Sequence, residues 1–153
     1  MTTALTGHVT FRIGERCYAA PLAMVREIVR LEGLAELPGM APPLAGVIDL
    51  RGTALPVLDI RRVPDGGRPG GDVLVLEVAA GAAPLGVVVD EVRSVVGADA
   101  LRPSAGPVAT GLLPPYVVDV LHDGDAQVFL VDLRAMFAVP ADGAGAGAAP
   151  AQT

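Results

Sequence analysis

Glycine and proline interrupt this chain about every five positions, with 19 glycines and 14 prolines among 153 residues. Such frequent interruption leaves no room for long helices, because proline breaks a helix and glycine weakens one. Valine contributes 22 residues, and its β-branched side chain favours extended backbone. Hydrophobic residues make up 52% of the chain, enough to form a core. The sequence therefore predicts one all-β domain of short strands.

The charge of the chain argues against nucleic acid as a partner. The formal net charge is −6 and the sequence contains no lysine, so a surface that neutralises phosphates is hard to build. Val78 to Val89, the longest apolar stretch, is shorter than the roughly 20 residues of a membrane helix, so we expect no direct membrane insertion. Met1 to Gly7 resembles no secretion signal, and Cys17 alone cannot form an internal disulfide, so we expect a cytoplasmic protein.

The chain opens with a predicted β-hairpin. Val9, Phe11 and Ile13 alternate with polar residues, which is the pattern of a strand with one face in water. Gly14-Glu15 suits a two-residue turn, and Arg16 to Ala20 then forms the second strand.

The segment after this hairpin allows two interpretations. Pro21 suits the first position of a helix, and Val25, Ile28 and Val29 then fall on one side, which favours a short amphipathic helix. The segment is only ten residues long, so a strand with Val25, Glu27 and Val29 on one face is the alternative.

Apolar runs and turn residues place the remaining elements. The glycine-rich Pro64 to Asp72 is expected to form a surface loop between two halves of the domain. Gly97 to Pro115 is a long loop or contains a short helix, and Asp132 to Val139 is a closing turn or short helix. Residues 140–153 are expected to be a disordered Gly/Ala/Pro tail. Further strands are predicted at Gly46–Leu50, Ala54–Ile60, Val73–Val78, Leu85–Val89, Val117–Leu121 and Val128–Val131, with Arg51-Gly52 and Asp123-Gly124 as turns.

A short motif occurs twice in the sequence. Asp59-Ile60-Arg61 and Asp132-Leu133-Arg134 each end an apolar strand, 73 residues apart. The echo suggests two related small barrels side by side. Barrels of about 60 residues bury too little apolar surface to be stable alone, so a shared core is expected between them.

The sequence contains no convincing catalytic constellation. Neither Ser94 nor Ser104 lies in a nucleophile elbow, and Cys17 on a predicted strand fits a packed thiol. His8 and His122 have no second ligand at metal-binding spacing. We therefore predict no catalytic residue, no metal site and no cofactor. The competing hypothesis is a small hydrolase or thiol enzyme that uses Cys17 or one of the acidic pairs.

Two adjoining runs carry a family resemblance. Gly46 to Gly52, GVIDLRG, and Leu55 to Arg61, LPVLDIR, resemble the signature of the CheW family of chemotaxis coupling proteins. The resemblance implies a single domain over residues 7–139, built as two five-stranded barrels side by side with a shared core and one or two short helices. Further matches follow in order at Phe11, Tyr18, Val25 to Ile28, Leu85 to Val92, Leu101 to Pro103 and Leu130 to Leu133.

The resemblance also implies a function. Members of this family are noncatalytic adaptors that link the cytoplasmic tip of methyl-accepting chemoreceptors to the regulatory domain of a CheA-type histidine kinase. The receptors hold the adaptor at the inner face of the membrane, in signalling arrays where self-association is a further expectation. The alternatives are a divergent scaffold that binds the kinase but not receptors, and a role in a chemosensory pathway other than motility.

By the same resemblance, the receptor tip docks in a groove at Val25, Glu27, Arg51, Val73 and Gly86. Val25 and Val73 would form an apolar floor, and Arg51 would hold Glu27 together with polar groups of the partner. Gly86 could equally serve only strand curvature. No kinase-contact residue is implied.

The chain departs from the family pattern at two positions. Asp49 stands where the family has asparagine, and it could either tether Arg51 or cap the turn. Asp119 stands where a glycine is common, which puts the local strand geometry in doubt.

Overall fold

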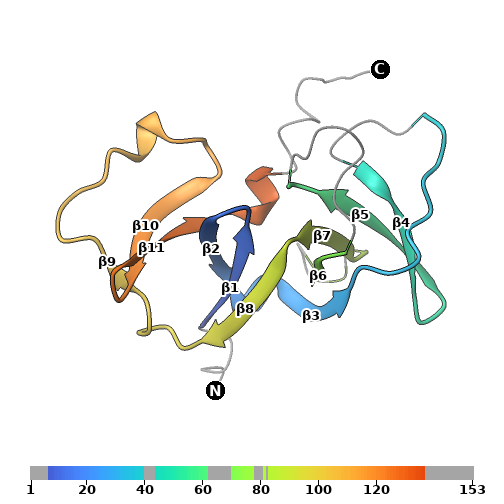
Figure 1. Cartoon of the computed structure of the whole chain (residues 1–153), viewed down its shortest axis with the longest axis horizontal. Helices are drawn as coiled ribbons and strands as arrows, with labels where there is room; N and C mark the ends of the chain where they lie inside the picture. The colour runs from blue at the N-terminus through green and yellow to red at the C-terminus, as the bar shows by residue number, and fades with distance from the viewer. Residues whose placement is uncertain (1–6, 40–43, 62–69, 78–80, 82, 137–153) are drawn as a thin grey trace.

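The computed structural model describes residues 7–39, 44–61, 70–77, 81 and 83–136, which form two β-sheets side by side (Figure 1). The six-stranded sheet has the order β8-β1-β2-β11-β10-β9 and the five-stranded sheet the order β3-β6-β7-β5-β4. The first sheet contains β1 (His8–Ile13), β2 (Arg16–Pro21), β8 (Glu91–Val96), β9 (Arg102–Pro103), β10 (Val117–Asp123) and β11 (Ala126–Val131). The second contains β3 (Val25–Arg30), β4 (Leu44–Leu50), β5 (Thr53–Asp59), β6 (Asp72–Leu76) and β7 (Leu85–Val89). Two 3-10 helices, η2 (Leu22–Met24) and η3 (Thr110–Leu112), and a helical turn at 133–136 complete the described elements.

The prediction of an all-β fold is confirmed, and the predicted hairpins are present. The helix favoured after Pro21 is wrong: only the single turn of η2 forms there, and the chain continues as β3. The strand is favoured because β3 forms an antiparallel ladder of backbone hydrogen bonds with β6. An isolated short helix is only marginally stable. Extended backbone also suits the β-branched Val25, Ile28 and Val29.

Two strands were not predicted. β8 mixes charged and apolar residues without a clean alternation, and β9 is a two-residue strand inside the segment interpreted as a long loop. β9 pairs with β10 and gives its sheet a sixth strand, where five were expected. Of the two alternatives for this segment, a long loop or a short helix, the structure has a loop that contains the three-residue 3-10 helix η3.

The two sheets repeat one arrangement of strands. In the five-stranded sheet, β5 pairs in parallel with β7 and so joins the hairpins β4–β5 and β6–β7, with β3 outside β6. In the six-stranded sheet, β11 pairs in parallel with β2 and so joins the hairpins β10–β11 and β1–β2, with β8 outside β1. The repeated motif lies at equivalent places in the two sheets: Asp59 is the last residue of β5, and Asp132 directly follows β11. In both copies the backbone N–H of the motif arginine donates to the aspartate Oδ1 at 3.0 Å.

The sheets do not divide at the loop Pro64 to Asp72, as the sequence suggested. Most of that segment lies outside the described residues, but the strands on its two sides, β5 and β6, belong to the same five-stranded sheet. The reason is that β1 pairs with β8 and β2 pairs with β11, so the six-stranded sheet combines the N-terminal hairpin with strands after residue 90, and the strands between them form the other sheet. The predicted tail, 140–153, also lies outside the described residues.

The apolar interior has three parts. One cluster lies inside the five-stranded sheet and a smaller one inside the six-stranded sheet. The largest combines residues of both sheets and is the shared core that the size of the barrels requires. Its buried members are Val9, Phe11, Ala20, Leu74, Leu76, Val87, Val89, Val117, Val131 and Leu133.

The five-stranded sheet curls until its two edges meet. Ala35, which follows edge strand β3, exchanges two backbone hydrogen bonds with Val47 of the opposite edge strand β4, at 2.9 and 3.0 Å. Gly46 makes this contact possible, because a Cβ there would lie 2.4 Å from the Ala35 carbonyl oxygen. The closure brings β3 near the tip of the hairpin β4–β5.

Candidate functional site

The tip of the hairpin β4–β5 is a tight two-residue turn, as predicted. Arg51 has φ 51° and Gly52 has φ 87°, so both residues occupy the left-handed region that a type I′ turn requires. Few residues other than glycine adopt this conformation, and it is favoured at functional positions. The Asp49 carboxylate accepts the Gly52 N–H at 3.1 Å. Of the two roles considered for Asp49, the structure shows the capping of the turn.

Arg51 extends from this turn to Glu27 on β3. Its Nη1 donates to Glu27 Oε1 at 3.1 Å, and its Nη2 donates to Oε2, so the pair is bidentate. The arginine side chain is 68% exposed and the glutamate side chain 28% exposed. The hydrogen bond and the charge of Arg51 hold the pKa of Glu27 below its usual range. Because exposed ion pairs add little to stability, this arrangement does more to orient a cation at the surface than to hold the fold.

The lowered pKa of Glu27 predicts a pH dependence of this pair. A carboxylate whose pKa is depressed in the folded state contributes stability above its unfolded pKa and loses it as pH falls through the folded pKa. We therefore expect the pair to persist at neutral pH. It should break only when the pH falls below the ordinary pKa of glutamate, which is about 4. Carboxyl NMR titration of Glu27 checks this, and Arg51→Ala should raise its pKa. An identical titration in both proteins would show that Arg51 does not act on Glu27.

β3 adds apolar surface beside this pair. The ladder between β3 and β6 shifts register between Val25 and Glu27, which is a bulge of the kind common next to functional sites. Val25 is partly buried and packs against the shared core, whereas Ile28 is 39% exposed. In the alternation of β3, Ile28 lies on the face opposite Glu27, together with the exposed Arg26 and Arg30.

The structure separates the five predicted groove residues into two groups. Glu27 and Arg51 are in direct contact, and Val25 lies on the same strand as Glu27. Val73 and Gly86 instead lie inside the five-stranded sheet. Val73 has no exposed surface, so its interpretation as a groove floor is wrong. The cause is its place in β6, which is covered on both faces.

Gly86 serves the packing of this interior. A Cβ at Gly86 would lie 2.7 Å from Val73 Cγ1, closer than real Cβ atoms approach a neighbour. The residue pairs with Val75 on one side and with Val57 on the other, and it is buried. Glycine is therefore required where side chains from two neighbouring strands fill the space.

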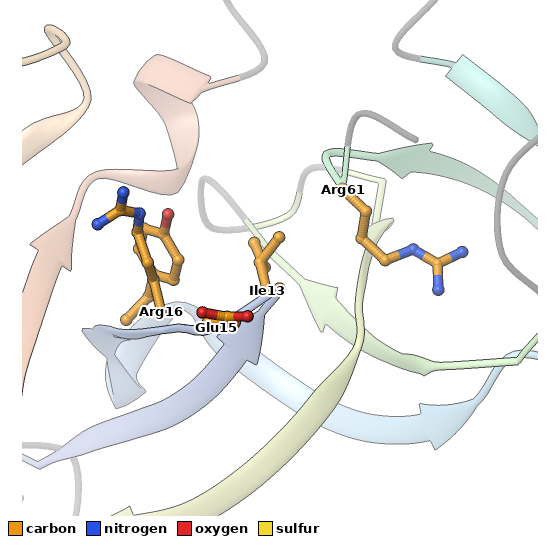
Figure 2. A pocket seen from close by; sticks show the side chains of 6 residues that line it. Ile13, Glu15, Arg16 and Arg61 are labelled. Carbon is orange, nitrogen blue, oxygen red and sulfur yellow. The ribbon is translucent and has the colours of Figure 1, made fainter. Parts of the chain in front are cut away.

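A hollow of about 400 Å³ lies between the turn of the hairpin β1–β2 and the end of β5 (Figure 2). Burial raises the pKa of Tyr18, which also stacks on Phe11 with ring centroids 5.8 Å apart. Both sheets contribute to the hollow, because most of its lining residues belong to the β1–β2 hairpin and Arg61 follows β5. Its lining residues are Ile13, Gly14, Glu15, Arg16, Tyr18 and Arg61.

The residues considered for catalysis or metal binding lie apart from the Glu27–Arg51 pair. Cys17 is partly buried against the core of the six-stranded sheet. Ser104 Oγ donates to the Val120 carbonyl at 3.0 Å and lies 3.3 Å from His122 Nε2, a contact that the sequence did not indicate. Across the part of the chain that the structure describes, no three His, Cys, Asp or Glu side chains are grouped to hold a metal ion. Within the same residues, no helix has the length and hydropathy to cross a membrane.

Comparison with known proteins gives one consistent match. Residues 7–141 match the family model of the CheW-like domain. A chemotaxis protein CheW from Treponema pallidum (strain Nichols) is 23% identical over 138 residues, which cover 84% of this chain and 80% of the relative. A chemotaxis protein CheW from Bacillus subtilis (strain 168) is 33% identical over 54 residues, 35% of each protein.

The fold also matches a solved structure. The crystal structure of the scaffolding protein TtCheW from Thermoanaerobacter tengcongensis superposes with a TM-score of 0.66 at 23% identity. The match covers 86% of this chain and 87% of that chain. At this level of identity the likeness shows a common fold.

Proposed function

Because the chain belongs to the CheW-like domain family, we propose that it is a noncatalytic chemotaxis adaptor with two protein partners. One partner is the cytoplasmic tip of a methyl-accepting chemoreceptor, and the other is the regulatory domain of a CheA-type histidine kinase. The adaptor works in the cytoplasm and is held near the inner face of the membrane by the receptors. The Glu27–Arg51 pair at the surface is the observation that carries the receptor half of this proposal.

The chemistry of the pair suits a helical partner. A receptor tip is an amphipathic helical hairpin, and such a partner needs apolar contact together with a few polar groups that fix its orientation. Glu27 takes one N–H from each terminal nitrogen of Arg51, and the exposed remainder of the guanidinium can donate to a carboxylate or carbonyl of the partner. Val25, on the same strand as Glu27, offers partly buried apolar surface. The docking surface in this proposal is therefore Val25, Glu27 and Arg51, without Val73 and Gly86.

Packing of the candidate nucleophiles supports a noncatalytic role. Cys17 contacts apolar neighbours, and the Ser104 hydroxyl, which lies 3.3 Å from His122 Nε2, donates to the Val120 carbonyl. A thiol enzyme would need Cys17 as an accessible thiolate. Slow alkylation of Cys17 in the native protein is therefore the expected result, and fast alkylation would favour the enzyme hypothesis.

Two separate pull-downs test the proposal. The full chain is incubated with a soluble receptor signalling fragment in one experiment and with the regulatory domain of the kinase in the other. We expect both partners to bind. Binding to the kinase domain alone would favour a divergent scaffold that has lost receptor binding, and binding to neither would overturn the proposed function.

A further inference from the structure

Asp90 is the single residue between the two sheets at the crossover from β7 to β8. β7, in the five-stranded sheet, ends at Val89, and β8, in the six-stranded sheet, begins at Glu91. A one-residue connection leaves little freedom in position but still allows rotation about its backbone bonds. The contacts of this residue therefore help to set the angle between the sheets, together with a second hydrogen bond from the Val92 N–H of β8 to Asp72 Oδ2 of β6 at 2.8 Å.

The carboxylate of Asp90 bonds to both sheets. Its Oδ2 accepts the backbone N–H of Gly14 at 2.7 Å, in the turn of the hairpin β1–β2. Its Oδ1 accepts a longer hydrogen bond, at 3.5 Å, from Nη1 of Arg61, which lies just after β5 in the five-stranded sheet. The backbone N–H of Asp90 also donates to the Arg12 carbonyl at 3.0 Å. Since only 9% of its side chain is exposed, these contacts are largely shielded from water.

Arg61 is held in place before it reaches Asp90. Its side chain is 2% exposed, and Nε and Nη2 donate to the two oxygens of Asp59 at 2.9 and 2.8 Å. Nη1 donates further to the Gly70 carbonyl at 3.0 Å. A buried guanidinium is costly unless it is paired, and here carboxylates from two positions surround it. The orientation of Arg61 is therefore fixed by its own sheet.

The contact lies beside the hollow between the sheets. Gly14 and Arg61, which both contact the Asp90 carboxylate, are both lining residues of the hollow. Figure 2 shows Ile13, Glu15 and Arg16 along the hairpin side and Arg61 on the other side. The hydrogen bonds of Asp90 therefore link the two sheets beside this hollow.

We propose that Asp90 and Arg61 form a positioning clasp that helps to set the angle between the two sheets, and hence the position of the receptor surface on the five-stranded sheet relative to the six-stranded sheet. This inference rests on the proposed function. The shared core stabilises the junction through apolar contact, which is non-directional. Charge-assisted hydrogen bonds fix both distance and direction. The clasp supplies the directional contact that the shared core does not.

The internal repeat provides a matched control. Asp132 and Arg134 repeat the local hydrogen bond of Asp59 and Arg61, at the end of β11. Their side chains are 40% and 62% exposed, and their ion-pair distance is 3.9 Å. The same motif therefore occurs at a solvent-exposed position, where neutralising its aspartate changes charge without touching the clasp.

Spin-label distances test the clasp directly. One label is placed at Ala54 on β5 and the other at Gln127 on β11, both exposed, in a Cys17→Ser background. We expect a single narrow distance distribution in the parent protein, a clearly broader one in Asp90→Ala and an unchanged one in Asp132→Asn. A distribution that stays narrow in Asp90→Ala while the unfolding temperature falls would overturn the proposal, because Asp90 would then only anchor the fold.

A second variant covers the case in which Asp90→Ala does not fold. Arg61→Lys keeps the buried charge but loses the planar fork that reaches Asp59 and Asp90 together. We expect it to broaden the same distribution, and a parent-like distribution in folded Arg61→Lys would contradict the clasp.

Binding experiments connect the clasp to the adaptor role. In Asp90→Ala we expect near-parental affinity for the receptor fragment and for the kinase regulatory domain separately, but a roughly tenfold weaker ternary assembly, within the usual range of coupling between sites. Equal weakening of the binary and ternary complexes would indicate a purely structural role. If the parent chain binds neither partner, the proposed function fails, and the spin-label result still decides the clasp.

Discussion

Replacing Arg51 with glutamate is expected to abolish co-sedimentation with a receptor fragment while the unfolding temperature stays nearly unchanged. The substitution places a second carboxylate against Glu27 and removes the cation that a partner would meet, a loss on the order of 100-fold in affinity. The fold should tolerate it because the Arg51 side chain is 68% exposed and Asp49 still caps the turn. Co-sedimentation and thermal unfolding, measured on the same preparation, check both halves of the prediction.

The control for this variant is Arg134→Glu. Arg134 is 62% exposed and lies beside Asp132, so the change has the same effect on net charge and also sets two carboxylates together. It lies in the helical turn that follows β11 of the other sheet. We expect Arg134→Glu to retain receptor binding. Equal loss in both variants would indicate a general effect of net charge, and a large drop in the unfolding temperature of Arg51→Glu would make Arg51 a structural residue.

The elements that sequence analysis predicted correctly are those whose pattern is local. The alternation of Val9, Phe11 and Ile13 and the turn residues Arg51-Gly52 depend only on near neighbours in the chain, and the structure has both. β3 was ambiguous because its six residues fit either period, and the ladder with β6 that decides the matter is a tertiary contact. The return of the N-terminal hairpin to the end of the chain is likewise non-local.

The candidate site could be predicted only in part, for a related reason. The family resemblance indicated Glu27 and Arg51. In a continuous apolar run, however, the sequence does not show which side chains are buried and which lie at the surface. Val73 belongs to such a run in β6, so nothing in the sequence distinguishes a groove floor from a core position. The Asp90–Arg61 contact could not be predicted for the same reason, because the repeated motif predicts the end of a strand at Arg61 but not the burial of its side chain.

Substitution of Gly86 is expected to show that this residue acts through packing. A Cβ at this position would lie 2.7 Å from Val73 Cγ1, 3.2 Å from Leu55 Cδ2 and 3.3 Å from Val57 Cγ2. All three side chains are fully buried, so they cannot move aside without disturbing other contacts. Gly86→Ala should therefore lower the free energy of unfolding by about 1–3 kcal/mol, and Gly86→Val by more.

Urea denaturation measures the effect, with Gly106→Ala as the control because no atom approaches a Cβ at Gly106 within 4 Å. A double mutant tests whether Val73 is the residue that obstructs a Cβ at position 86. Val73→Ala removes the obstructing methyl groups, so Gly86→Ala should lower the free energy of unfolding less in the Val73→Ala background than in the parent protein. Additive effects would contradict the contact between Gly86 and Val73. If Gly86 instead touched the receptor, Gly86→Ala would weaken receptor binding at unchanged stability, whereas a packing residue lowers stability first and binding only as the folded population declines.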